Sequence, residues 1–109
     1  MEPILSIADI NESYGLDFFD KYVNLNFLKK GLFGAVKVDD TIRIPYRMIE
    51  YIEHSVKSSW LGKKQRVVIQ LLEKHPELTK LTLDFEFDIT KRTDDVDAVL
   101  TKIAKKVDK

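Results

Sequence analysis

Residues 81–88, with the sequence LTLDFEFD, alternate strictly between apolar and polar side chains, and no other segment constrains the fold as strongly. A period of two places one set of side chains on each face of an extended strand. The set expected to face a core consists of Leu81, Leu83, Phe85 and Phe87. Because the strand has no obvious hairpin partner, we expect it to add to a hairpin predicted at residues 36–44, pair with a second copy or extend the sheet of another protein.

A helix is predicted directly after this strand. Thr93 can cap its first turn, which is rich in aspartate, and lysines gather towards its end, as the helix dipole favours. The apolar stripe expected to be buried consists of Val96, Val99, Leu100, Ile103 and Val107.

The first thirty residues predict two helices separated by a short turn. The first covers residues 7–14, with Gly15 in the position that ends a helix. The second begins at Asp17, a good N-cap, and ends in two lysines followed by Gly31. Two helices joined through a glycine-containing turn form a helix-turn-helix.

The middle of the chain predicts a hairpin and two further helices. Residues 36–44 alternate around Asp39 and Asp40 and indicate a short β-hairpin. Pro45 suits the first turn of a helix over residues 46–56, and another helix begins near Lys63. The predicted fold is therefore α+β: a mostly helical winged helix-turn-helix module at residues 1–60, followed by a helix–strand–helix extension at 61–109 that packs on it or serves dimerisation.

One set of positions keeps the order of helix, turn, helix, hairpin and the sequence RIP: Ser6, Ile7, Ile10, Gly15, Gly31, Leu32, Ala35, Lys37, Val38, Arg43, Ile44 and Pro45. At these positions, residues 5–53 resemble the small winged helix-turn-helix domains of the excisionase and MerR-like group. The resemblance implies a DNA-binding protein that acts as a regulator or as an architectural or accessory factor in recombination or replication of a mobile element, such as a phage.

Charge is distributed unevenly although the total is zero. The net charge is −5 over residues 1–20, +6 over residues 21–66 and −1 over residues 67–109. Since cations must neutralise phosphates in a DNA complex, the basic middle supplies the expected contacts. The candidate DNA-binding residues are Lys21, Asn24, Lys29, Lys30, Lys37, Thr41, Arg43, Lys57, Lys63, Lys64 and Arg66. Trp60 lies within this basic region, and we expect it to cover the core rather than stack on a base.

The composition argues against an enzyme and against a bound cofactor or metal. The chain has no cysteine, and its two histidines, His54 and His75, lack the spacing of a helical zinc pair. Asp84, Glu86 and Asp88 share one strand face, which we interpret as a solvated face rather than a cation site. No apolar run is long enough to span a bilayer and the N-terminus is acidic, so the expected location is the cytoplasm, with no membrane partner.

An alternative function is an accessory subunit that binds a larger replication or recombination enzyme, with DNA contact secondary. Aromatic and large apolar side chains are typical anchors of protein interfaces. The candidate partner-binding residues are Phe18, Phe19, Tyr22, Leu83, Phe85 and Phe87, and a homodimer through the final strand and helix is a further possibility.

Overall fold

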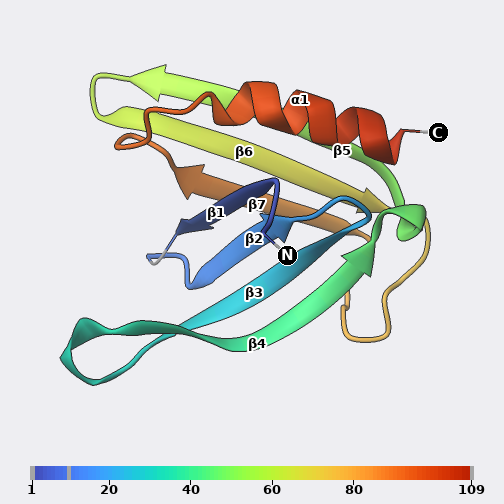
Figure 1. The fold of residues 1–109 in the computed structure, drawn as a ribbon, viewed down its shortest axis with the longest axis horizontal. Helices are drawn as coiled ribbons and strands as arrows, with labels where there is room; N and C mark the ends of the chain where they lie inside the picture. Colours follow the sequence, from blue (N-terminus) through green and yellow to red (C-terminus); the bar gives the residue numbers. More distant parts are fainter. Residues whose placement is uncertain (1, 10, 109) are drawn as a thin grey trace.

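The computed structural model describes residues 2–9 and 11–108 and contains two antiparallel sheets and one α-helix (Figure 1). The first sheet has the order β1 (Leu5–Asp9), β2 (Tyr14–Phe18), β3 (Tyr22–Lys30) and β4 (Val36–Pro45). The second has the order β5 (Ile49–Ser59), β6 (Gly62–Leu71) and β7 (Thr82–Asp88). Helix α1 (Val96–Val107) follows, and short 3₁₀ turns occupy η1 (Leu32–Gly34) and η2 (Tyr46–Met48).

The expected mostly helical winged helix-turn-helix is therefore wrong. The segments predicted as four helices form strands β1, β2, β3, β5 and β6 instead, and the described part of the chain contains no helix-turn-helix. Ile10, an apolar position of the first predicted helix, lies outside the described residues. The expected 36–44 hairpin is a single strand, β4, in which Asp39 forms a β-bulge rather than a turn.

Period-two patterning explains why the N-terminal segment forms a strand. Leu5 and Ile7 are buried while their neighbours are exposed, which is the alternation of a half-buried strand. Gly15 does not end a helix but pairs with Ala8 in the adjacent strand. A Cβ atom at position 15 would lie 3.1 Å from the Cβ of Ala8, so glycine allows the close approach of β1 and β2.

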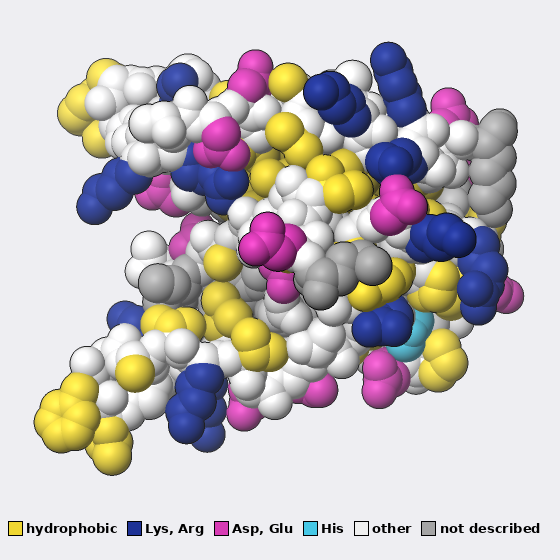
Figure 2. All heavy atoms as spheres, in the orientation of Figure 1, with side chains coloured by type: hydrophobic (Ala, Val, Ile, Leu, Met, Phe, Trp, Pro, Cys, Tyr) yellow, Lys and Arg dark blue, Asp and Glu magenta, His cyan; other side chains and the backbone are white. Residues whose placement is uncertain are grey.

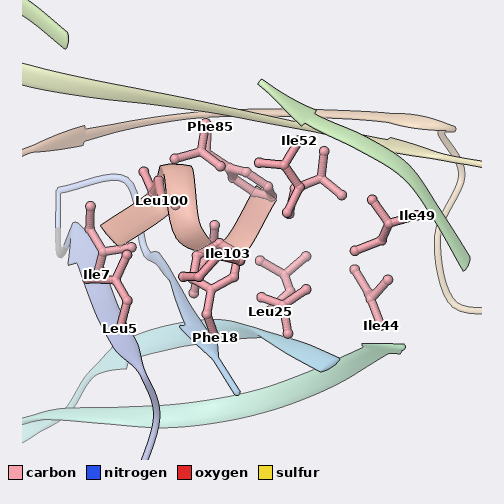
Figure 3. Packing of buried hydrophobic residues seen from close by; sticks show 14 of the residues in the cluster. Leu5, Ile7, Phe18, Leu25, Ile44, Ile49, Ile52, Phe85, Leu100 and Ile103 are labelled. Atoms are coloured by element: carbon pink, nitrogen blue, oxygen red, sulfur yellow. The ribbon is translucent and has the colours of Figure 1, made fainter. Parts of the chain in front are cut away.

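The core lies between the two sheets, and α1 closes one side of it (Figure 3). Leu100 and Ile103 of the helix are fully buried among side chains from both sheets, including Phe18 and Ile52. The helix packs chiefly against β5, with further contacts to β1 and η2. One apolar cluster therefore holds the first and the second half of the chain together.

The predicted final strand and final helix are confirmed, whereas the helix expected from Lys63 is strand β6. β7 covers residues 82–88 with Phe85 and Phe87 buried, and it pairs with β6 rather than with the 36–44 segment. The predicted apolar stripe of α1 is buried or partly buried. The N-cap is Asp95 rather than Thr93, and its side chain accepts a hydrogen bond from the Ala98 amide.

Side chains connect the edges of the two sheets. The Tyr14 hydroxyl of β2 donates to the Glu86 carbonyl of β7 at 3.1 Å and accepts from the Glu86 amide at 3.3 Å. The Asp9 carboxylate of β1 accepts from the Asp88 amide at 3.2 Å. These contacts occupy part of the β7 edge, which would otherwise offer free backbone groups to another strand.

Candidate functional site

Two β-hairpins project from the same end of the molecule (Figure 1). We call residues 29–37, which join β3 to β4, the first tip, and residues 57–64, which join β5 to β6, the second tip. Each tip carries two consecutive large apolar residues followed by a glycine: Leu32, Phe33 and Gly34 in the first, and Trp60, Leu61 and Gly62 in the second. In Figure 2 both projections end in hydrophobic side chains with lysine or arginine beside them.

The apolar residues of the first tip are exposed to solvent. Leu32 and Phe33 are 85% and 104% exposed, which means that no other part of the described chain covers them. Phe33 has a φ of 64°, a left-handed conformation that is uncommon for an aromatic residue. A hydrogen bond from the Gly31 amide to the Ala35 carbonyl closes the loop and holds these side chains at its end.

The second tip is a tighter turn that also exposes two apolar side chains. Ser59 pairs with Gly62, so Trp60 and Leu61 form a two-residue loop, and they are 92% and 76% exposed. Trp60 does not cover the core, contrary to the prediction. Polar residues and glycine normally occupy such turns, so an exposed tryptophan–leucine pair there is a departure from ordinary turn chemistry.

A pair of lysines lies behind each apolar tip. Lys29 is directly opposite Lys37 in the β3–β4 register, and Lys57 is directly opposite Lys64 in the β5–β6 register. Like charges in this position repel each other and destabilise the sheet. None of these four exposed lysines forms an ion pair with a described residue, although Asp88 lies opposite Lys64 on the other side of β6.

The structure divides the candidate DNA-binding residues into separate groups. Six of them lie at the two tips: Lys29, Lys30, Lys37, Lys57, Lys63 and Lys64. Lys21 lies in the turn at the opposite end of β3. The Arg66 guanidinium of β6 lies 2.7 Å from the Asp84 carboxylate of β7, and the two groups form an ion pair.

The remaining candidates lie on the outer face of the first sheet. The Thr41 hydroxyl donates to Asn26 at 2.8 Å, Arg43 lies over the ring of Tyr22 at 4.1 Å, and the side-chain oxygen of Asn24 is buried. Arg43 belongs to the first sheet, whereas the lysines that follow Val56 belong to the second.

Most of the predicted partner-binding residues are structural. Phe18, Phe85 and Phe87 belong to the buried core, and Leu83 packs against it. Phe19 and Tyr22 are half-buried and stack on each other with ring centroids 4.8 Å apart.

The sequence interpretation missed Leu32, Phe33 and Leu61 as candidate functional residues. The available signal was a large apolar pair followed by glycine and flanked by lysines, present twice in the chain. The signal is obscured because residues 29–31 also fit a helix end and Trp60 also fits a core position.

The described residues contain no cluster of histidine, aspartate or glutamate able to hold a metal ion. His54 and His75 lie apart, and each is engaged by the protein: His54 with Asp97 at 2.6 Å, and His75 with the Arg43 carbonyl at 3.0 Å. The face with Asp84, Glu86 and Asp88 is exposed, as predicted. The Thr90 hydroxyl and amide donate to Asp88 and lower the pKa of its carboxyl group.

Across the described residues, no helix combines the length and apolar character needed to cross a bilayer. No protein family, curated protein or solved structure matches the chain.

Proposed function

We propose that this protein binds the surface of an anionic lipid bilayer through its two hairpin tips. The observation that carries the proposal is the shared construction of the tips: two exposed apolar side chains at the outermost point, with a pair of lysines behind them, repeated at one end of the molecule.

The order of the groups along each tip matches the order of layers in a membrane. Lys29 and Lys57 each precede the first apolar residue of their tip by three positions. Three residues of extended chain span about 10 Å, and apolar groups at an interface reach about 5–10 Å below the headgroups. When the apolar pairs lie among the acyl chains, the lysines therefore lie at the level of the lipid phosphates.

Two tips also meet an energetic requirement of membrane binding. A single small apolar anchor binds only marginally, and stable association takes a second anchor or a basic patch. Each lysine near an anionic surface contributes about 1 kcal/mol. Because both hairpins extend from strands that share one apolar core, insertion of the first tip raises the effective concentration of the second at the membrane.

A bilayer explains these features better than a nucleic acid or a protein partner. Phosphate backbones attract the lysines and bases can stack on Phe33 and Trp60, whereas a bilayer accommodates all four apolar side chains together with the lysines. A protein interface places its apolar contacts in a continuous centre with a polar rim, whereas here two separate projections carry them at their ends (Figure 2). The absence of a long apolar run and the acidic N-terminus, on which the expectation of no membrane partner rests, do not bear on two surface tips.

Sedimentation with vesicles tests the proposal. The protein should sediment with vesicles containing phosphatidylserine, and with those of phosphatidylcholine alone only weakly. Replacing Leu32 and Phe33 together, or Trp60 and Leu61 together, by serine should weaken binding about tenfold or more, since each buried CH₂ group contributes about 0.8 kcal/mol.

The matched control is the double substitution of Leu72 and Leu81 by serine, because these side chains are exposed apolar residues away from both tips. Equal binding by tip and control variants would contradict the proposal, as would binding to duplex DNA without binding to vesicles. The alternative of an accessory subunit for a larger enzyme stays a prediction. Binding of such an enzyme to the two tips would also count against the proposal that the tips bind lipid.

A further inference from the structure

The first tip contains a hollow that both of its paired lysines line. The hollow has a volume of about 260 Å³ and is bounded by Lys29, Gly31, Lys37, Val38 and Asp39. The Cε atom of Lys37 would lie 3.6 Å from a Cβ atom at position 31, so the lysine stem passes close to the glycine backbone. Two lysine side chains from neighbouring strands thus line one small concave space.

The charge in this hollow favours a particular kind of anion. Two lysines held opposite each other repel, and a group carrying two negative charges on one phosphorus relieves this repulsion better than a group carrying one. A phosphomonoester has a charge of about −1.5 to −2 at neutral pH and three acceptor oxygens, whereas a phosphodiester has a charge of about −1. Asp39 also lines the hollow, and its negative charge opposes an anion that the two lysines attract.

The second tip is a weaker candidate for the same role. Its lysine pair is partly balanced by Asp88, which lies opposite Lys64 in the β6–β7 register. The pKa of the Asp88 carboxyl is lowered mainly by hydrogen bonds from Thr90, with a smaller contribution from Lys64. In the first tip, Lys37 has no residue in this position, because β4 is the edge strand of its sheet. The hollow that Lys29 and Lys37 line together also distinguishes the first tip, although Asp39 lines it as well.

We propose that the hollow of the first tip binds the phosphomonoester headgroup of a membrane lipid through Lys29 and Lys37. This inference rests on the proposed membrane binding and names the class of lipid that the surface prefers.

The test compares two vesicle compositions that carry the same total negative charge, one with phosphatidic acid and one with phosphatidylserine. We expect about fivefold tighter binding to the vesicles that contain phosphatidic acid. This factor is the change in affinity expected when a lysine meets one additional elementary charge at a membrane surface. Lys37→Met should abolish this preference while leaving some binding to phosphatidylserine.

Lys30→Met is the matched control, because Lys30 lies on the same tip and loses the same charge but does not line the hollow. It should weaken binding to both vesicles equally and keep the preference. Asp39→Asn should increase the preference for phosphatidic acid, since it removes the opposing carboxylate.

Equal affinity of the unmodified protein for the two compositions would overturn the headgroup assignment and leave the membrane proposal intact. A failure to bind vesicles of either composition would overturn both. If Lys30→Met removes the preference for phosphatidic acid as completely as Lys37→Met does, total charge rather than the hollow determines that preference. This result would also overturn the headgroup assignment.

Discussion

The Nδ1 atom of His54 in β5 lies 2.6 Å from Oδ1 of Asp97 in the first turn of α1. The same carboxylate oxygen accepts a hydrogen bond at 3.1 Å from Gln65, whose side chain is fully buried in β6. One aspartate therefore joins the helix to two strands of the second sheet, at the side of the core that the helix closes.

This junction predicts a dependence of stability on pH. The hydrogen bond from His54 holds the pKa of Asp97 below its usual value, with a smaller contribution from Gln65 and with burial acting in the opposite direction. A lowered folded-state pKa stabilises the protein above the unfolded-state pKa of about 3.9, and this stabilisation is lost as the pH falls through the folded-state value. Asp97→Asn should lower the urea midpoint at pH 7. Below about pH 4, the variant should lose less further stability than the unmodified protein does.

Urea unfolding across this acidic range measures the effect. Asp108→Asn, at the exposed C-terminal end of α1, serves as the control and should follow the unmodified protein. Parallel curves for the Asp97→Asn variant and the unmodified protein at every pH would show that Asp97 does not contribute to acid sensitivity.

Gly62 is predicted to be the least replaceable glycine at the tips. It has a φ of 138°, and an added Cβ would lie 2.3 Å from the Thr90 hydroxyl oxygen, which also accepts from the Lys63 amide at 3.0 Å. Gly62→Ala should therefore destabilise the fold by about 1–3 kcal/mol through strain, with further loss from the displaced Thr90.

Gly34 provides the comparison, because it also has a positive φ, 78°, but nothing lies within 4 Å of its added Cβ. Gly34→Ala should lower the free energy of unfolding by only about 1 kcal/mol, as measured by thermal or urea unfolding. A larger loss for Gly34→Ala than for Gly62→Ala would contradict the role assigned to the close contact with Thr90.

Tyr14 is expected to protect the edge of β7. Tyr14→Phe removes the hydroxyl that bonds to both backbone groups of Glu86 but keeps the ring contacts with Phe85 and Phe87. We predict a loss of about 1 kcal/mol in stability and faster hydrogen exchange at the Glu86 amide. Tyr51→Phe is the control, since this ring is exposed on β5, and unchanged exchange in the Tyr14 variant would contradict the edge-closing role.

The C-terminal third of the fold could be predicted from the sequence because local and tertiary preferences agree there. In β7, strict alternation matches a strand with one buried face, and in α1 the apolar stripe, acidic first turn and basic last turn all favour a helix. The partner of β7 could not be predicted, since the pattern of β6 also fits a helix.

The remaining strands resemble helices in sequence for identifiable reasons. Ile49 and Ile52 are three positions apart, as on a helix face, but a register shift between Ile49 and Tyr51 places both in the core from a strand. In β6, Val67, Val68 and Ile69 are all buried, which removes the alternation that marks a strand. Pro45 does precede a helical turn, but that turn is only η2, the connection between the sheets.

The candidate site depended on information that a single sequence does not contain. The sequence indicates the lysines, yet the pairing of Lys29 with Lys37 and of Lys57 with Lys64 requires the strand register. That both tips lie at one end follows from the packing of the two sheets, which residues distant in the chain determine.

Trp60 gives the most direct measurement of the central claim, because it is the only tryptophan in the chain and lies at the second tip. On vesicles containing phosphatidylserine, its fluorescence emission should shift to shorter wavelength, and lipids with brominated acyl chains should quench it. Emission that stays at the wavelength of a solvent-exposed tryptophan at saturating lipid, with no quenching, would contradict membrane binding through the tips.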